Sequence, residues 1–262
     1  MSNAALHVAR TGLDAQNTKM RVIANNLANV NTTGFKRDRA DFETLAYQQM
    51  IAAGANSDSE NKYATGLALG SGVALQGTSR TDTQGTLNQT GNSLDLAIEG
   101  AGYFQLQQPD GTIAYTRAGN FSLTAEGAIV SSDGLPLIPQ IQVPDGASSI
   151  TIGNDGSVSA TVPGQTEPTQ LGQIETARFV NPSGLESVGG NLLKETAASG
   201  TPQVGVAGLD GRGNVRQGSL EGSNVNVVEE LVDMIETQRA YEVNSKMIKA
   251  TDEMLQYVNQ QL

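Results

Sequence analysis

Two stretches at the ends of the chain place apolar residues at helical spacing. In the N-terminal stretch such positions recur every three or four residues, with Gln16 as the single polar member. The apolar members are Leu6, Ala9, Leu13, Met20, Ile23, Leu27 and Val30. This spacing predicts an amphipathic helix over residues 4–30 with a coiled-coil-like seam. We expect the chain to turn by Gly34, because glycine readily adopts the left-handed conformation that ends helices.

The C-terminal stretch carries two apolar rows on one predicted helix. The first row is spaced by seven and consists of Val227, Met234, Tyr241, Ile248, Leu255 and Leu262. The second row wanders along the helix through Val228, Ile235, Ala240, Met247 and Met254. A wandering row suggests contacts with more than one neighbour. Asn226 is the predicted N-cap, and Glu229 and Glu230 follow it where they suit the helix dipole.

The middle of the chain changes to the pattern of short strands. Runs such as 103–106, 112–115, 128–130, 141–143 and 150–152 are rich in β-branched, aromatic and aliphatic residues. Asp-Gly pairs beginning at Asp110, Asp133, Asp145 and Asp155 separate these runs. This punctuation predicts antiparallel hairpins in a sandwich or barrel. Residues 52–92 are instead rich in Gly, Ser, Thr, Asn and Gln, as expected of an extended arm that a neighbour orders.

These patterns together predict an α+β fold. The long N- and C-terminal helices should pack antiparallel as a coiled-coil-like stalk. Between them in the sequence should lie an extended arm and a central all-β domain. We expect this domain to be rich in hairpins and similar to a sandwich or barrel. The predicted segments are the N-terminal helix at 1–34, the arm at 35–93, the β domain at 94–205, a return connection at 206–224 and the C-terminal helix at 225–262.

Composition narrows the functional classes. The 262 residues carry a net charge of −11, so the chain lacks the positive field that nucleic acid would require. The absence of cysteine excludes disulfides, Cys-ligated zinc and iron–sulfur clusters. The charge is uneven, with a net +4 over residues 1–39 and a net −5 from residue 221 onward, which favours association of the two ends.

The sequence contains no run typical of a membrane span or a cleavable signal. No segment approaches 18 consecutive apolar residues, and the N-terminus lacks a basic stretch followed by an apolar one. We therefore expect no membrane insertion. If the protein leaves the cytoplasm, a different export route carries it.

The sequence singles out no catalytic, cofactor-binding or metal-binding residue. It lacks the phosphate-cradle, zinc-protease and nucleophile-elbow motifs. His7, the one histidine, is expected to be a solvated residue on the N-terminal helix. The Asn154-Asp155-Gly156 and Asp210-Gly211 segments lack the ligand spacing of a calcium loop and are predicted to be turns. Nothing distinguishes a carboxylate pair among the 27 acidic residues.

The terminal apolar rows have two interpretations. They either pack onto the β domain as ordinary amphipathic helices or bury against neighbouring copies of the chain. The polarity of residues 52–92 favours assembly, because that segment offers little apolar surface to cover two long helices. The predicted self-assembly residues are Leu6, Leu13, Met20, Ile23, Leu27, Val30, Val227, Leu231, Met234, Tyr241, Ile248 and Leu255.

Both ends of the chain resemble one known family. The segments Ala24–Val30 and Thr33–Arg37 are similar to the N-terminal signature of bacterial flagellar rod and hook proteins. Ser223–Asn226, Glu229–Val232 and Gln238–Tyr241 are similar to the C-terminal signature, and Asp95–Ile98 with Gly100–Phe104 to the start of the β domain. The motif residues are Asn25, Asn26, Asn29, Gly34, Phe35, Asn224, Asn226 and Arg239. The resemblance is greatest to the distal rod members, although Ala64, Arg216 and Ser219 depart from their usual pattern.

The resemblance implies a non-enzymatic structural subunit of the flagellar basal body that serves motility. Its copies would stack helically into the distal rod, which spans periplasm to outer membrane as a drive shaft, with the terminal helices lining the inner tube and the arm stiffening the rod. Implied partners are further copies, other rod proteins, the hook protein, the P-ring and L-ring proteins and the flagellar type III export apparatus. The alternatives are a proximal rod or hook homologue and a secreted β-rich binding module.

Overall fold

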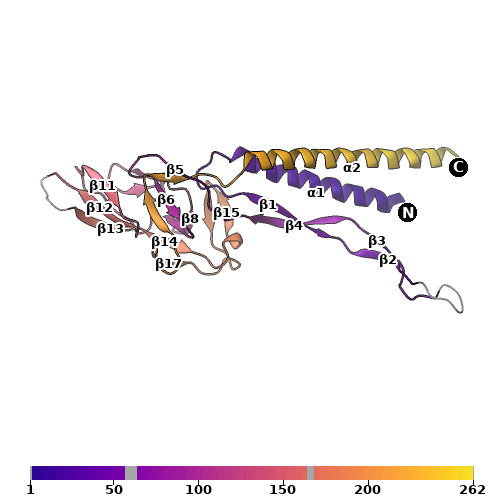
Figure 1. The fold of residues 1–262 in the computed structure, drawn as a ribbon, viewed down its shortest axis with the longest axis horizontal. Helices are drawn as coiled ribbons and strands as arrows, with labels where there is room; N and C mark the ends of the chain where they lie inside the picture. The colour runs from indigo at the N-terminus through magenta and orange to yellow at the C-terminus, as the bar shows by residue number, and fades with distance from the viewer. Residues whose placement is uncertain (1, 57–63, 164–167, 262) are drawn as a thin grey trace. The chain divides into compact units, whose positions relative to one another are not determined.

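The computed structural model describes residues 2–56, 64–163 and 168–261, which form two compact units (Figure 1). The helical unit comprises residues 1–27, 38–79 and 226–262, and the β unit comprises residues 28–37 and 80–225, each within the described ranges. The chain is therefore α+β, as predicted, with one helix near each end and strands between them. Within the described ranges, no helix is long and apolar enough to cross a membrane.

The helical unit contains α1 (Ser2–Ala28) and α2 (Val227–Gln261), which pack together. Two contacts give their direction. Asn26 of α1 donates to Glu230 of α2, while Gly12 of α1 lies against Asn244 of α2. Moving back along α1 thus means moving forward along α2, so the helices run antiparallel, as the sequence predicted.

The helix boundaries follow local hydrogen bonding. At the start of α2, the Asn226 side chain accepts the Val228 N–H at 3.1 Å, which confirms the predicted N-cap. The predicted N-terminal helix, 4–30, is displaced by two residues, because α1 begins at Ser2 and ends at Ala28. A turn replaces its last residues, and in that turn the Thr32 N–H and hydroxyl both donate to Asn29, each at 3.1 Å.

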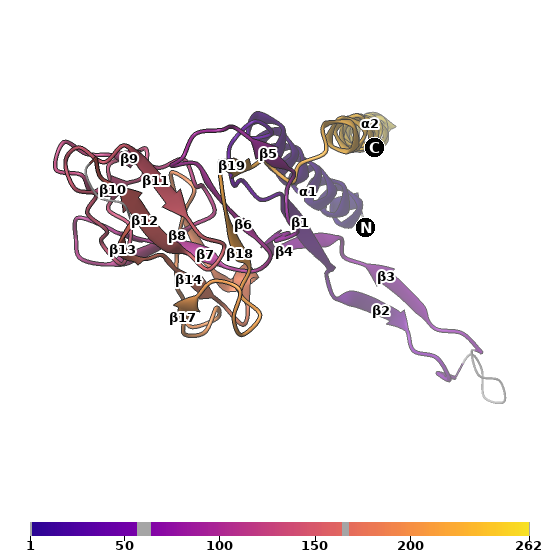
Figure 2. The ribbon, with the colours of Figure 1, turned by 60° about the vertical axis from the view of Figure 1, so that its left-hand side comes forward.

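The described arm consists of antiparallel strand pairs within the helical unit (Figures 1 and 2). β1 pairs with β4 and β2 with β3, the latter in a register that places Tyr47 opposite Gly70. The arm also bonds to α1, since the Thr11 hydroxyl accepts the Val73 N–H at 3.4 Å. The bounds are β1 Asp38–Thr44, β2 Tyr47–Ile51, β3 Leu67–Gly70 and β4 Val73–Arg80.

The β unit is built from short strands in several sheets. A six-stranded sheet has the order β15-β16-β8-β7-β14-β17, a three-stranded sheet the order β11-β12-β13, and the pairs β10-β9, β18-β6 and β19-β5 complete the described strands. The bounds are β5 Leu87–Gln89, β6 Leu96–Glu99, β7 Tyr103–Gln107, β8 Ile113–Thr116, β9 Ser122–Leu123, β10 Ile129–Val130, β11 Ser149–Ile152, β12 Ser157–Thr161, β13 Thr169–Gln173, β14 Glu175–Arg178, β15 Glu186–Gly189, β16 Leu192–Lys194, β17 Gln203–Val206, β18 Asn214–Gln217 and β19 Ser219–Glu221, with one 3₁₀ turn at Pro182–Gly184.

The Asp-Gly turns match the hairpins that the sequence predicts. Asp110-Gly111 lies between the antiparallel strands β7 and β8, and Asp155-Gly156 lies between β11 and β12. The run at 141–143 was wrongly predicted to be a strand, because it makes only the isolated bridge between Ala128 and Gln142. Its alternating Ile141 and Val143 are instead buried core residues, which give the same pattern without a ladder.

Two apolar clusters stabilise the β unit, and β7 contributes to both. Phe104 and Leu106 belong to the larger cluster, where the Phe104 ring meets Phe121 edge-on at 5.2 Å. Tyr103 belongs to the smaller cluster, with Tyr115 and Phe179. Since successive residues of a strand point to opposite faces, β7 separates the two clusters and is buried on both sides.

Replacing Phe104 with alanine should lower the free energy of unfolding of the β unit by about 3–5 kcal/mol, because the ring is fully buried and leaves a cavity. Ile113→Ala on the adjacent strand β8 is the matched control, since Ile113 is 41% exposed and should cost less than about 1 kcal/mol. Urea unfolding followed by tyrosine fluorescence measures both variants. Equal losses would contradict the assigned core.

Candidate functional site

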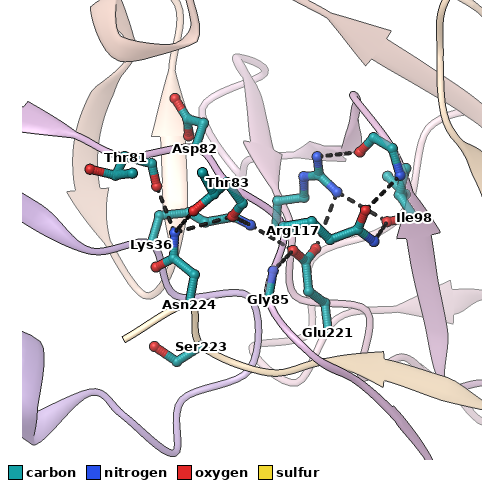
Figure 3. Close-up of polar contacts among 12 residues, drawn as sticks. Lys36, Thr81, Asp82, Thr83, Gly85, Ile98, Arg117, Glu221, Ser223 and Asn224 are labelled. Atoms are coloured by element: carbon teal, nitrogen blue, oxygen red, sulfur yellow. Dashed lines mark hydrogen bonds and ion pairs between the residues drawn. The ribbon is translucent and has the colours of Figure 1, made fainter. Parts of the chain in front are cut away.

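The most deeply buried ionic groups of the β unit gather around one carboxylate (Figure 3). The Glu221 side chain is fully buried, and it accepts from Lys36 Nζ at 2.6 Å and from Arg117 Nη1 at 3.1 Å. The side chains of Lys36 and Arg117 are only 3% and 7% exposed. We call Lys36, Arg117 and Glu221 the charge cluster.

Three separate segments bring the charge cluster together. Glu221 is the last residue of β19, which pairs with β5, and Arg117 directly follows β8. Lys36 lies in the segment that follows α1, where the Gly34 N–H donates to the Glu221 carbonyl at 2.8 Å. Arg117 and Glu221 lie about 80 and 185 positions after Lys36 in the sequence. Backbone pairing as well as charge therefore holds both residues next to Lys36.

Backbone groups pair with further polar atoms of the charge cluster. Lys36 Nζ also donates to the Thr83 carbonyl at 2.8 Å, and the Gly85 N–H donates to Glu221 Oε1 at 3.0 Å. Arg117 donates to the carbonyl of Ile98 at 3.1 Å and to that of Gly100 at 2.6 Å. Such extensive pairing is what allows charges to remain buried.

Burial has the largest effect on the pKa of Lys36. Removal of Lys36 from water lowers the pKa of its ammonium below the ordinary value of 10.5, and the hydrogen bond and charge of Glu221 act in the opposite direction. Lys36 is enclosed by its partners and presents no open face to a substrate. The arrangement therefore suits holding chain segments together and not acid–base chemistry.

Near the charge cluster, the Asn224 side chain forms hydrogen bonds with backbone groups from two segments. Its side-chain oxygen accepts the Arg37 N–H at 2.7 Å, and its amide nitrogen donates to the Thr81 carbonyl at 2.7 Å and to the Thr83 carbonyl at 3.1 Å (Figure 3). The Asn224 N–H also donates to the Phe35 carbonyl at 3.4 Å. The N-terminal and C-terminal sequence motifs thus meet through a single asparagine.

Gly34 is at a position that only glycine suits. Its φ of +70° is left-handed, as the sequence analysis expected. An added Cβ would lie 2.7 Å from the backbone of Arg117 and Ala118. The motif glycine therefore lets the chain pass directly over the segment that carries Arg117.

A second buried amide lies in the helical unit. Asn26 is 1% exposed, and its side chain accepts the Asp38 N–H at 3.0 Å while donating to the Asp38 carbonyl at 2.8 Å. It also donates to the fully buried Glu230 at 3.3 Å. One side chain thus joins α1 to the first residue of β1 and to the first turn of α2.

The predicted assembly residues differ in exposure. Ile23 is buried in the helical unit, whereas Val227, Leu231 and Tyr241 are 39%, 44% and 39% exposed. The half-buried members are Leu6, Leu13, Met20, Leu27, Val30, Met234 and Ile248, while the side chain of Leu255 lies outside the described residues. Their role in assembly stays a prediction. His7 is exposed, as expected.

The family-motif residues fall into two groups. Asn26, Gly34, Phe35, Asn224 and Asn226 make the contacts described above, and Asn29 forms the turn after α1. Asn25 and Arg239 are exposed on the helices. Sequence reasoning did not select Arg117, Glu221 or Asp38, because an isolated charge in a polar segment carries no periodic signal. The only available indication was Lys36, which lies inside the N-terminal motif.

Glu221→Gln should lower the free energy of unfolding by about 3–5 kcal/mol, since it leaves two buried cations without their counter-charge. Glu99→Gln is the matched control, because the Glu99 carboxylate is 55% exposed and 3.7 Å from Arg216. That exposed pair should contribute about 0–1 kcal/mol. Urea titration of both variants measures the difference. A loss for Glu221→Gln as small as for the control would contradict the structural role of the charge cluster.

The lowered pKa of Lys36 also gives a pH dependence. Between its folded pKa and 10.5 the unfolded chain binds more protons than the folded chain, so stability rises with pH in that window. Relative to Lys36→Met, the wild type should therefore gain stability as pH approaches 10.5, by at most about 1.4 kcal/mol per pH unit. Urea unfolding of both proteins across this window measures the gain. A constant difference between them would contradict the prediction.

Comparison with known protein families matches three parts of the chain. The model described as flagella basal body rod protein matches residues 6–36. The flagellar hook protein FlgE/F/G D1 domain matches residues 97–160, and the flagellar basal body rod FlgEFG protein C-terminal model matches residues 216–261. The charge cluster takes one residue from each matched segment.

Individual relatives match nearly the whole chain. The flagellar basal-body rod protein FlgG of Buchnera aphidicola subsp. Acyrthosiphon pisum is 53% identical over 98% of both chains. In Caulobacter vibrioides, FlgG is 46% identical over 98% of both chains, whereas FlgF is 35% identical over 93% of this chain and 92% of its own. Within one organism the similarity is thus greater to FlgG than to FlgF. The chain therefore belongs to the flagellar basal-body rod protein family, and within it to the FlgG group of structural distal rod subunits.

Proposed function

We propose that copies of this chain assemble helically, through their terminal helices, into a rigid distal rod that transmits torque from the motor to the hook. The observation that supports this is a second face of α2 that is apolar and exposed. Val228, Val232 and Ile235 are 69%, 51% and 50% exposed, and Leu231 beside them is 44% exposed. We call these four residues the outer face of α2. Their spacing of three and four residues places them on one side of the helix.

The outer face of α2 lies opposite a buried polar row. Glu230 and Thr237 are 0% and 1% exposed and are seven residues apart, two turns along the helix. The buried row takes part in contacts within the molecule, including the bond from Asn26. Apolar surface concentrated on the outer face is typical of a protein–protein contact.

Helical assembly requires that the outer face of α2 meet a different surface of a neighbouring copy. A contact between different surfaces of identical subunits is heterologous, and it produces a tube or filament when the rotation does not close a ring. Each large apolar side chain that becomes fully buried would contribute about 1.5–3 kcal/mol. In the assembled rod the terminal helices would pair as a coiled-coil-like inner tube, with the twelve predicted assembly residues at its seams and a sandwich- or barrel-like β domain outside.

The same proposal gives the setting of the protein. Rod and hook proteins would be its axial neighbours, and the P-ring and L-ring proteins would surround it between periplasm and outer membrane. The flagellar type III apparatus would export it without cleavage of a signal, and it would have no enzymatic activity. Membership of the FlgG group supports each of these statements.

Ile235→Asp should prevent formation of tubes by concentrated protein, because it places a charge on the outer face of α2. The β unit should remain folded, since Ile235 is exposed in the single chain. Electron microscopy and sedimentation of concentrated samples measure assembly, and circular dichroism measures folding. Gln140→Asp, which adds the same charge at an exposed polar position of the β unit and not on the helices, is the matched control and should still assemble. Equal assembly of Ile235→Asp and the wild type would refute the proposed interface.

A further inference from the structure

Five Asp-Gly pairs lie in turns of the β unit, beginning at Asp110, Asp133, Asp145, Asp155 and Asp210. An aspartate followed by glycine can form a cyclic imide, because glycine has no side chain to hinder the approach of its nitrogen to the preceding carboxyl carbon. The approach requires the peptide between the two residues to rotate. The hydrogen bonds of that peptide and of the carboxyl group therefore decide which pair can react in the folded protein.

In three of the pairs the glycine N–H closes the turn. The N–H groups of Gly111, Gly134 and Gly156 each donate to the carbonyl three residues earlier, at 2.9 Å in every case. Rotation of the Asp-Gly peptide would break this bond. These three nitrogens are therefore held in place by the turns that contain them.

Two of these three pairs are restrained through the carboxylate as well. The Thr112 hydroxyl donates to Asp110 Oδ1 and the Ser157 hydroxyl donates to Asp155 Oδ1, both at 2.6 Å. These bonds lower the pKa of both aspartates, so the carboxylates stay ionised. An ionised carboxylate reacts more slowly with an amide nitrogen, because its oxygen leaves less readily than that of a protonated acid.

The Asp210-Gly211 pair is restrained by two arginines. The Arg212 N–H closes this turn by donating to the Leu209 carbonyl at 2.9 Å, so the Asp-Gly peptide is the central one. Arg178 Nη1 donates to the Asp210 carbonyl at 3.1 Å, and Arg212 Nη2 donates to the Asp210 carboxylate at 2.8 Å. The first bond resists rotation of the peptide, and the second holds the carboxyl carbon away from the glycine nitrogen.

The Asp145-Gly146 pair lacks all of these restraints. Its turn is closed by the Ala147 N–H, which donates to the Pro144 carbonyl at 3.2 Å, so the Asp-Gly peptide is again the central one. Within the described ranges, the Gly146 N–H and the carbonyl and carboxylate of Asp145 make no hydrogen bond or ion pair. Both residues are exposed. The central peptide can therefore rotate while the bond that closes the turn remains.

We propose that Asp145 is the preferred site, among the five pairs, at which the folded protein forms the cyclic imide and then isoaspartate. The Gly146 nitrogen attacks Asp145 Cγ, a C–N bond forms and a C–O bond breaks, and the oxygen leaves as water with the amide proton and the carboxyl proton. Water then opens the ring at either carbonyl and gives aspartate or isoaspartate. No atom is gained or lost overall.

The modification should leave the β unit folded. Isoaspartate carries the main chain through Cβ, which adds one carbon to the connection between Val143 and β11. Both ends of this connection are anchored, since the Val143 N–H donates to the Gly127 carbonyl at 2.8 Å and β11 pairs with β12. The additional carbon lies in the exposed turn, where it displaces no core residue.

Incubation of the dilute full chain in mildly acidic H₂¹⁸O tests the proposal, because ring opening places one ¹⁸O atom in the residue that reacted. Mass spectrometry of peptides measures the label at all five pairs, in the folded chain and in urea, and circular dichroism verifies folding. The ratio of uptake in urea to uptake in the folded chain is the protection of each pair. Intrinsic effects of neighbouring residues cancel in this ratio. Asp145 should have the smallest protection of the five.

Asp145→Glu removes the site, since the longer side chain would need a less favourable six-membered ring. Uptake of label in this peptide should be lost. Asp133→Glu in another exposed turn is the matched control and should leave uptake at Asp145 unchanged. Electron-transfer fragmentation of the wild-type peptide should identify isoaspartate at position 145.

Either of two results would overturn the proposal. The first is a protection at Asp145 as large as that at any of the other four pairs. The second is label at Asp145 without isoaspartate, which would indicate oxygen exchange at the carboxyl group without an imide. The wild-type measurements decide the question even if Asp145→Glu does not fold. They use the single chain, so they are independent of tube formation.

Discussion

The buried carboxylate of Glu221 is the interaction on which the organisation of the β unit depends. It fixes Lys36, eight residues after the end of α1, and lies six residues before the start of α2. Arg117 adds the β8 segment to the same point. Because each charge is almost fully removed from water, none is tolerable without the others. The segments that lead from the β unit toward both helices are thereby held at one place, and three separately matched family segments contribute to it.

In the helical unit, polar groups form contacts between α1 and α2, whereas many apolar side chains of α2 remain exposed. The contact between α1 and α2 includes the hydrogen bond from Asn26 to Glu230 and the approach of Gly12 to Asn244, both of which are polar or small contacts of specific geometry. A buried polar pair can set helix register at some cost in stability. The apolar side chains that would stabilise the helices more strongly remain on the outer face of α2. In the proposed rod, neighbouring chains would therefore pair by hydrophobic burial, whereas the two helices of one chain meet through specific polar contacts.

Local signals in the sequence were sufficient to predict several helices and hairpins, but they did not predict the charge cluster. The helical spacing predicted both helices, Asn226 predicted the N-cap, and Asp-Gly pairs predicted the β7–β8 and β11–β12 hairpins. The run at 141–143 misled because a buried core segment alternates like a strand. Lys36, Arg117 and Glu221 carry no mutual spacing, since long-range strand pairing decides which charges meet. The second, wandering row of α2 did contain Val228 and Ile235 of the exposed outer face.

Arg117 shows why an arginine suits the charge cluster. Its guanidinium presents five donors in a fixed planar fork, whereas a lysine presents one compact ammonium. Nη1 serves Glu221 and the Ile98 carbonyl, and Nη2 serves the Gly100 carbonyl. These bonds orient the guanidinium plane, whose central carbon lies 5.4 Å from the centroid of the Tyr103 ring. The charge cluster therefore holds its carboxylate with one compact ammonium and one rigid planar cation, and the arginine also fixes the backbone carbonyls of Ile98 and Gly100.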